Sequence, residues 1–511
     1  MGSSGRLRQS LLANTCDMRE NRILGTEVEY GITVTNDAAF NPVAASASLV
    51  NAHAKGANRV NWSYDDESPG RDARGFTLGS IPIDETDSGL VNAVLHNGAR
   101  LYVDHAHPEY STPECGDPLE AALHDKAGEL IVHRAVVQVN ATLPQGSRML
   151  IHKNNSDGKG NSYGAHENYL VPRSVPFGDI VHHMTAFMVS RQILTGSGKV
   201  GSEHGRTSVP FQLTQRADFF EEEVGLETTL KRPIINTRDE PHADPSKYRR
   251  LHVIFGDATM SEIQTFVKLA STSLLLMALA DDALGAPIRL ERPVEAVTAV
   301  SHDITGTTKL DLFEAEPSSP LELQWRYLTL VEAYLGSNDL PPVYKQALSE
   351  WRGLLEDFEY GYAAVADRLD WAAKLSILEA YRDRDGLEWS DPKLALLGLQ
   401  YHDVDPAKGL YHRLVAKGRM RTLFTAEDIE RAASRAPEST RAWFRGECLR
   451  RYPNEVVAAN WDSLVFDVGR SSLVRVPMME PLRGSRAIVE ELLAASPDAA
   501  TLVDNLGGAD D

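Results

Sequence analysis

The chain has few of the residues that mark secreted, membrane and nucleic-acid-binding proteins. Its 511 residues include three cysteines, Cys16, Cys115 and Cys448, whose odd number and wide spacing indicate reduced thiols in a cytoplasmic protein. The longest apolar stretch, residues 269–280, contains serine and threonine and ends at two aspartates, so we expect no membrane span. The net charge of −20 argues against a general nucleic-acid binder, because phosphate contacts require a basic surface.

Several familiar site signatures are incomplete. Gly196-Ser197-Gly198-Lys199 resembles a phosphate-binding loop, but it lacks the upstream glycine and the hydroxyl residue after the lysine. His107-Pro108-Glu109 matches half of a zinc deaminase signature, but Cys115 has no partner in a CxxC pair. Cys115 also lies among acids, which raise the pKa of a thiol and argue against a nucleophilic cysteine. With these three kinds of site excluded, a site built from carboxylates and histidines remains as the candidate.

The length of the chain favours two domains. Strand and helix patterns alternate from residue 22 to about 260, and residues 321–435 are mostly helical. We therefore expect a large domain over residues 22–424 and a small C-terminal domain over 425–511, after a disordered tail at 1–21. Residues 57–88 have little periodicity, and so long a loop is usually functional or disordered. We expect a mobile insertion that tunes rate rather than folding.

Local signals place several elements. Asp117, followed by Pro118 and Glu120, predicts a helix start with a capping side chain. Residues 148–152, 162–171 and 248–255 are predicted strands. Thr259 and Glu262 form an expected capping box at the start of a long helix.

The first strand carries two acids on one side. Glu27 and Glu29 are two residues apart, and side chains alternate across a strand, so they share a face. Leu24, Val28 and Tyr30 take the other, apolar face. Because unpaired carboxylates are costly to bury, the acidic face needs a cation, and Mg²⁺ is the leading candidate.

A second strand repeats this pattern. Arg100, Tyr102 and Asp104 alternate with apolar residues, and Glu109 follows shortly after. An arginine, a tyrosine and carboxylates on one face suit an anionic ligand with a metal ion. The alternative for each strand alone is an ordinary solvated polar face, and the presence of two such strands favours the metal site.

Further candidates lie downstream. Glu167 stands next to His166, and His252 interrupts an apolar strand, where a single histidine is more often a hydrogen-bonded core residue. Arg238 is a candidate contact for a phosphate or carboxylate. More than one ion could be held against a triphosphate by the set Glu27, Glu29, Glu109, Glu167 and His252.

Five long motifs resemble one family, that of the Pup ligase and the Pup deamidase, where Pup is a small prokaryotic ubiquitin-like modifier. The motifs are GTEVEYG at 25–31, NGARLYVDHAHPEYSTPE at 97–114, SYGAHENYL at 162–170, NTRDEPHAD at 236–244 and RLHVIFGDATMSE at 250–262. The resemblance runs from about Arg22 to the segment at Trp461. It implies an α+β fold similar to glutamine synthetase, with an antiparallel sheet lined by acidic residues and packed by helices, plus a smaller C-terminal domain.

Two details within the family favour the deamidase. The spacer between Asp104 and His107 is short, whereas the ligase has a longer one, and the insertion at 57–88 resembles a loop that the ligase lacks. The resemblance then implies a hydrolase that converts the C-terminal Gln of Pup to Glu and cleaves the isopeptide bond between Pup and a lysine. Its partners would be Pup and pupylated proteins of the proteasome pathway, with ATP and Mg²⁺ as bound cofactors.

The resemblance also implies roles for individual residues. Asp104 would be the catalytic carboxylate, as general base or as nucleophile. Arg100, Thr112 and Trp461 would contact ATP. The metal ligands would be Glu27, Tyr102 and Glu109, together with Glu29, Glu167 and His252.

Two other functions stay open at this point. A Pup ligase would use the same sheet to form the isopeptide bond with ATP, and a non-catalytic protein would bind Pup in a nucleotide-dependent way. An acidic Pup segment would need a basic groove, although scattered solvated charges are an equal alternative. The candidates for that groove are Arg206, Lys231, Arg232, Arg249 and Arg250.

Overall fold

The computed structural model describes residues 22–54, 60–64, 67–77, 91–339 and 341–507. The expected tail at 1–21 lies outside the described residues, as do residues 57–59, 65–66 and 78–88 of the predicted insertion. Neither the disorder of the tail nor the mobility of these parts of the insertion is therefore tested.

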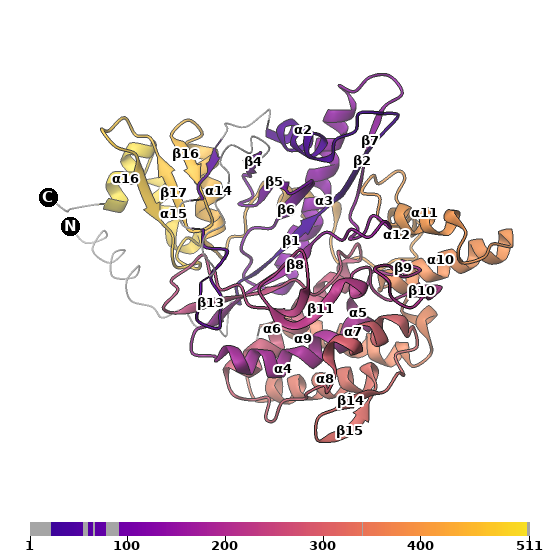
Figure 1. Ribbon diagram of the computed structural model, residues 1–511. Helices are drawn as coiled ribbons and strands as arrows, with labels where there is room; N and C mark the ends of the chain where they lie inside the picture. Colours follow the sequence, from indigo (N-terminus) through magenta and orange to yellow (C-terminus); the bar gives the residue numbers. More distant parts are fainter. Residues whose placement is uncertain (1–21, 55–59, 65–66, 78–90, 340, 508–511) are drawn as a thin grey trace.

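A six-stranded sheet forms the centre of the fold (Figure 1). The strand order is β13-β8-β1-β6-β5-β4, and every neighbouring pair is antiparallel. The strands are β1 (Leu24–Glu29), β4 (Asn92–Val94), β5 (Arg100–Asp104), β6 (His107–Ser111), β8 (Ala165–Pro172) and β13 (Tyr248–Val253). The predicted antiparallel sheet with acidic residues on one face is confirmed.

Helices cover the apolar face of this sheet. Val28, Leu101 and Tyr110 share a core with α3, and Tyr169 shares one with α6. Helix α3 lies so close to β6 that a Cβ on Gly128 would be 2.4 Å from the ring of Tyr110. The helices of the main body are α2 (Pro42–Ala54), α3 (Pro118–Asn140), α4 (Phe177–Ser190), α5 (Gln192–Thr195), α6 (Glu262–Ala280), α7 (Pro293–His302), α8 (Pro320–Gly336), α9 (Pro342–Phe358), α10 (Asp370–Asp385), α11 (Pro392–Gln400), α12 (Leu410–Ala416) and α13 (Ala426–Ser434).

Two helix starts were predicted with different success. Asp117 caps α3 as expected, because its side chain accepts hydrogen bonds from the backbone N–H groups of Leu119 and Glu120. The capping box at Thr259 was wrong, since Ser261 is the capping residue of α6 and accepts from the N–H of Gln264. Within the described residues, α6 is the one helix long and apolar enough to cross a membrane, and most of it is buried inside the fold.

Smaller sheets surround the main one. They are formed by β2 (Gly31–Thr35) with β7 (Arg148–His152), β9 (Lys199–Val200) with β10 (Phe211–Gln212), β11 (Phe220–Gly225) with β12 (Arg232–Asn236), and β14 (Leu310–Leu312) with β15 (Ala315–Ser318). Two short 3₁₀ helices complete this part of the chain, η1 (Ala217–Phe219) and η2 (Tyr362–Val365).

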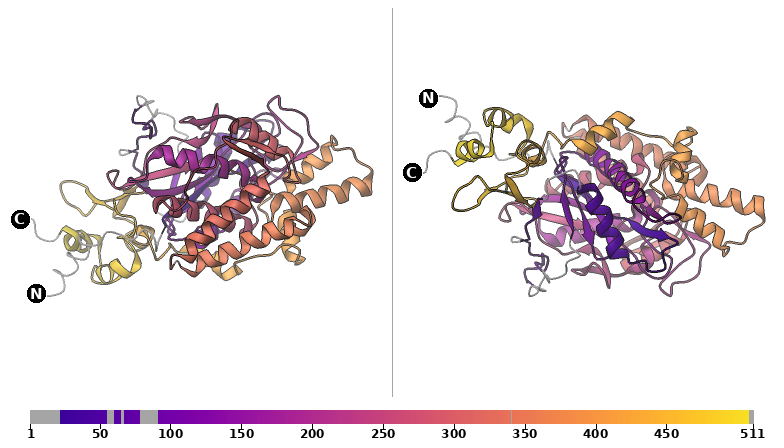
Figure 2. Two further views of the ribbon diagram at one scale, coloured as in Figure 1. Left: turned by 90° about the horizontal axis from the view of Figure 1, so that it is seen from below. Right: turned by 90° about the horizontal axis from the view of Figure 1, so that it is seen from above.

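The C-terminal part has a core of its own, formed by residues such as Phe444, Leu464 and Val503. It lies at one end of the molecule in both views of Figure 2, with the helices of the 370–420 region at the other end. Its elements are α14 (Arg441–Arg451), β16 (Val456–Ala459), β17 (Ser463–Phe466), β18 (Val474–Pro477), α15 (Arg486–Ala494) and α16 (Ala499–Gly507). The boundary near Thr425 stays a prediction, and helix α13 packs against α3 of the main body.

One strand of the C-terminal sheet comes from the N-terminal half of the chain. Strand β3 (Asn61–Trp62) pairs in parallel with β16 and completes the order β18-β17-β16-β3. Val60 also belongs to the C-terminal core. Residues 60–62 of the predicted insertion are therefore part of the C-terminal sheet and core, and the expectation that the insertion tunes rate rather than folding stays a prediction.

Candidate active site

Antiparallel register brings the acidic residues of three strands into one row. Glu29 of β1 lies opposite Glu109 of β6, which in turn lies opposite Tyr102 of β5. Two residues farther along the ladder, and so on the same face, Glu27 and Arg100 both lie opposite Ser111. The two predicted polar faces are thus a single face of one sheet.

The first cluster on this face contains three carboxylates. One oxygen each of Glu29, Asp104 and Glu109 lies within 4.8 Å of the others. Glu109 is 1% exposed, and its Oε1 atom has no hydrogen-bond partner among the residues that the structure describes. Burial, followed by the charges of Asp104, Glu27 and Glu29, raises the pKa of Glu109 well above its ordinary value. Such a set of hard oxygen atoms is suited to a divalent cation.

Asp104 ends β5 at the tight hairpin to β6. Its Oδ2 atom is 3.1 Å from Nδ1 of His105, whose backbone has a φ of 50°. Burial raises the pKa of Asp104, but the hydrogen bond with His105 and the charges of His105 and His166 together hold the pKa below its ordinary value. Asp104 is thus an ionised, accessible carboxylate at the edge of the acidic cluster.

The second cluster consists of Glu27, His166 and His252. Asn168 donates to Glu27 from Nδ2 at 2.9 Å, so its Oδ1 atom accepts from Nδ1 of His252, also at 2.9 Å. This arrangement leaves the Nε2 atom of His252 with a free lone pair. Burial, with the charge of Arg250 next, lowers the pKa of His252 well below its ordinary value and keeps the ring neutral.

Glu27 stays ionised in this environment. Burial raises its pKa, but the hydrogen bond with His166 and the charge of Arg250, 3.7 Å away, hold the pKa well below its usual range. A carboxylate and the imidazole nitrogens of two histidines side by side form a second candidate cation site.

The prediction of Glu167 as a metal ligand was wrong. Glu167 lies opposite Thr26, on the helix-covered face of the sheet, and its carboxylate forms a buried ion pair of 2.7 Å with Arg191. Because neighbouring residues of a strand point to opposite faces, His166 occupies the acidic face instead.

Arg100 is directed along the same face. Its Nε and Nη2 atoms donate to Oδ1 of Asn92 at 2.8 and 2.6 Å. Arg100 is 8% exposed, yet it makes no ion pair with any described residue. A buried guanidinium without a carboxylate partner is suited to an anionic ligand.

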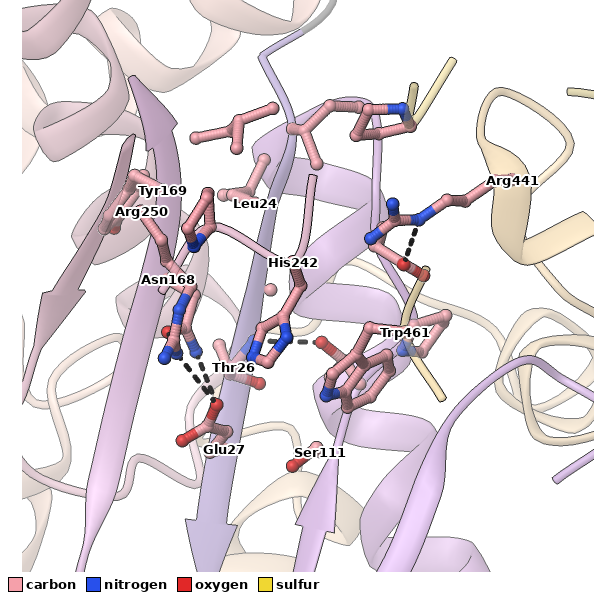
Figure 3. A pocket seen from close by; sticks show the side chains of 18 residues that line it. Leu24, Thr26, Glu27, Ser111, Asn168, Tyr169, His242, Arg250, Arg441 and Trp461 are labelled. Atoms are coloured by element: carbon pink, nitrogen blue, oxygen red, sulfur yellow. Dashed lines mark hydrogen bonds and ion pairs between the residues drawn. The ribbon is translucent and has the colours of Figure 1, made fainter. Parts of the chain in front are cut away.

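A pocket opens over β1 next to Glu27 (Figure 3). Its lining includes Gly25, Thr112 and the indole of Trp461, which comes from the C-terminal part and faces His242. A Cβ on Gly25 would approach Oγ1 of Thr112 to 2.9 Å, so glycine keeps this floor open. Further lining residues are Ile23, Leu24, Leu170, Pro241, Arg250 and Arg441.

Glu114 fastens the C-terminal part beside this pocket. Its carboxylate is 2.7 Å from Nε of Arg441 and also pairs with Arg445. Burial raises the pKa of Glu114, but the two guanidinium groups outweigh it and lower the pKa to about 2. Trp461 is therefore held by a charged contact between the two parts of the molecule.

Arg238 follows β12 and is tied to the described part of the insertion by a backbone bridge to Asp72. Its Nε atom is buried and has no hydrogen-bond partner among the described residues. Asp72 accepts hydrogen bonds from Thr237 and Arg74, which fixes the segment that carries Arg238.

The five basic residues proposed for a groove do not share one surface. Arg249 points to the helix side, where it donates to the carbonyl of Val175, whereas Arg250 reaches Glu27 on the acidic face. The other three, Arg206, Lys231 and Arg232, gather around β11. That strand itself carries Glu221, Glu222 and Glu223, so the surroundings are mixed in charge.

Comparisons with known proteins agree with this geometry. The model of the family described as "Pup-ligase protein" matches residues 22–465. The chain belongs to this family. It is 50% identical to a protein of Acidothermus cellulolyticus named "Depupylase", over 96% of this chain and 99% of the relative. It is 49% identical to the "Pup deamidase/depupylase" of Mycolicibacterium smegmatis, over 95% and 99%.

Solved structures of the family share the fold. The ligase PafA in complex with Pup superimposes with a TM-score of 0.80 at 29% identity, over 96% of this chain and 95% of that one. PafA in complex with ADP gives 0.72 at 33% identity, over 79% and 89%.

Sequence reasoning missed several residues of the site. His166 and Asn168 could have been found from the alternation of strand 162–171, in which Glu167, Tyr169 and Val171 form the buried set. His242 gave no periodic signal in the sequence, because it lies in a loop. Its own backbone φ is 47°.

Proposed function

We propose that the chain is a Pup deamidase and depupylase. It would hydrolyse the side-chain amide of the C-terminal Gln of Pup to Glu, and the isopeptide bond that joins the same carbonyl carbon to a lysine of a pupylated protein. The observation that carries this proposal is the position of Asp104, an ionised carboxylate at the end of β5 beside Glu29 and Glu109. The names of the relatives at about 50% identity support it.

One site can serve both reactions. Each breaks a C–N bond at the same carbonyl carbon and replaces nitrogen by oxygen from water. Asp104 would either take a proton from that water or attack the carbonyl carbon itself, with release of ammonia or the lysine amine in both cases. Trapping with hydroxylamine separates the two routes, because an acyl group on Asp104 is intercepted and a hydrolytic water is not.

The donor set fits Mg²⁺. Glu109 has a buried oxygen that no described residue bonds, and Glu27, Glu29 and Tyr102 lie next to it on the same face. These residues would hold the ion, with His252 contributing its free nitrogen. A bound cation supplies charge stabilisation for a developing oxyanion. The acids themselves orient that cation relative to Asp104.

A nucleotide fits beside this cluster. Arg100 and Arg238 would meet phosphate oxygens, and the pocket between Thr112 and Trp461 would take the base and sugar. The ADP complex of the related ligase supports this assignment. We propose ATP as the bound cofactor and the cytoplasm as the location, which agrees with the two described cysteines being free and buried.

The decisive experiment uses Pup ending in Gln, with ATP and Mg²⁺. Wild-type protein should convert Gln to Glu, detected by the mass change of amide to acid, and should release Pup from a pupylated substrate. Asp104→Asn should lose both activities while nucleotide binding persists. Near-normal turnover by this variant would refute the assignment of Asp104.

A Pup ligase is the second candidate, because the solved neighbours are ligases. Two parallel incubations with ATP distinguish the two functions, one of Pup ending in Glu with a lysine-bearing acceptor and one of the pupylated acceptor. Net isopeptide formation in the first favours the ligase, and net cleavage in the second favours the depupylase. Any turnover excludes a non-catalytic Pup-binding protein.

A further inference from the structure

Aromatic rings and guanidinium groups stack in a column that links both parts of the molecule. The guanidinium carbon of Arg100 lies 3.8 Å from the ring centre of Tyr102 and 4.0 Å from that of Trp62. Trp62 in turn meets Trp461 edge to face, with ring centres 5.2 Å apart and planes at 74°. Arg445 of α14 follows, 5.2 Å from the ring of Trp461.

Trp62 is the one member of this column that comes from the region predicted as an insertion. It is 7% exposed, and its Nε1 atom donates to Oε1 of Glu67 at 2.7 Å. Its backbone is fixed as well, because it pairs with Ala459 of β16, and the N–H of Ser63 donates to the carbonyl of Ala459. The indole is thus held from two sides against the guanidinium.

The column restricts Arg100 to one orientation. The rings of Tyr102 and Trp62 pack against its guanidinium group, and Asn92 and the hydroxyl of Tyr64 accept from Nε and Nη2. Its Nη1 atom makes no hydrogen bond with any described residue. Because two rings pack on the guanidinium group and its Nε and Nη2 atoms are already bonded, the Nη1 edge is the part left for a ligand such as a phosphate.

We propose that Trp62 is a positioning residue for the polyphosphate of the bound nucleotide, acting through Arg100. The inference rests on the proposed function, in which Arg100 contacts the nucleotide. Trp62 fixes the plane of Arg100 and, through Trp461, couples that plane to the wall of the pocket over β1. The described part of the insertion is therefore part of the nucleotide site.

The test compares three variants by calorimetric binding of ATP in the presence of Mg²⁺. Trp62→Leu keeps apolar volume but removes the aromatic face, and it should weaken ATP binding roughly tenfold, as expected for the loss of a desolvated cation–π contact. Trp62→Phe retains a ring and should recover most of the affinity. Trp443→Leu is the matched control, because Trp443 also stacks on an arginine, Arg486, but lies outside the pocket and the column.

A double-mutant cycle separates positioning from general structure. In an Arg100→Ala background, Trp62→Leu should cause little further loss, because Trp62 acts through Arg100. Equal losses in both backgrounds would overturn the proposal. So would ATP binding by Trp62→Leu within twofold of wild type.

Folding and the proposed function are checked in the same series. Thermal unfolding without nucleotide should be similar for Trp62→Leu and Trp443→Leu, and Trp62→Met replaces the leucine variant if that variant does not fold. A wild-type protein that binds no ATP overturns both this inference and the proposed nucleotide site. If wild type, Trp62→Leu and Trp62→Met all bind ATP equally well, the role of Trp62 is overturned and the proposed nucleotide site stands.

Discussion

Glu29 and Glu109 lie directly opposite each other in the β1–β6 ladder, with both carboxylates on the same face of the sheet. Like charges in this arrangement repel each other, and burial makes the repulsion stronger. The pair is thus unfavourable for folding alone and favourable for binding a cation.

Glu109→Gln should therefore stabilise the protein when no ligand is bound and reduce its stabilisation by Mg²⁺ and ATP. Without Mg²⁺, removal of the repulsion should raise the free energy of unfolding by on the order of 1 kcal/mol. With Mg²⁺ and ATP, the variant should lose most of the thermal stabilisation that these ligands give to wild type. Thermal unfolding under both conditions measures this, and a variant that is destabilised when empty would contradict it.

Glu27 and Glu167 offer a matched pair on the two faces of the sheet. Glu27→Gln should weaken ATP binding in the presence of Mg²⁺ and also lower the free energy of unfolding of the empty protein, because the lowered pKa of Glu27 means that its charged form stabilises the fold. Glu167→Gln breaks the buried ion pair with Arg191 and should lower the free energy of unfolding by about 3–5 kcal/mol. Calorimetry of ATP binding and denaturant unfolding of both variants test this contrast. Loss of metal-dependent ATP binding in Glu167→Gln, but not in Glu27→Gln, would contradict the assignment of Glu27 to the metal site.

The attachment of the C-terminal part should depend on pH through Glu114. Its pKa in the folded protein is about 2, lowered from 4.5, which corresponds to a contribution of about 3 kcal/mol at neutral pH. A lowered pKa stabilises the fold above the ordinary value, and the contribution disappears as the pH falls from 4.5 toward 2. The difference in unfolding free energy between wild type and Glu114→Gln should therefore be full at pH 7 and shrink below pH 4.5. A constant difference from pH 7 to pH 3 would contradict the ion pair.

Charge attraction for an acidic segment of Pup can be tested at Lys231, which is exposed beside β11. Lys231→Glu should raise the KM for Pup a few fold at about 50 mM salt, and the effect should fade at about 500 mM because screening shortens the reach of exposed charges. Arg249→Gln is the control, since Arg249 is buried on the helix side of the sheet. A salt-independent KM for wild type and Lys231→Glu alike would point to apolar recognition of Pup.

The sequence predicted the acidic face well, because alternation in β1 and β5 assigns each side chain to one face. It could not show that the two strands are joined by β6, which brings Glu29, Glu109 and Tyr102 into one row. His166 and Glu167 were exchanged because both are polar and only the buried residues that follow reveal which one points to the acidic side. An error of one position along a strand therefore assigns a side chain to the wrong face of the sheet.

The contribution of Trp62 could not be predicted from local patterns. Strand β3 has two residues, too few for periodicity, and its partner β16 lies almost 400 positions later. A separation of 327 residues likewise hides the contact between Glu114 and Arg441. Such pairs depend on tertiary packing, whereas the cap at Asp117 depends on its own three following residues and was predicted correctly.

The wall that Trp461 gives to the pocket over β1 has a consequence for protein synthesis. All six strands of the main sheet have left the ribosome once residue 253 is exposed, but Trp461 is made some 200 residues later. A nascent or prematurely terminated chain can thus assemble the acidic face without the wall. Any ligand of this pocket can stabilise the protein only near the end of translation, so truncated products would gain no protection from it against proteolysis.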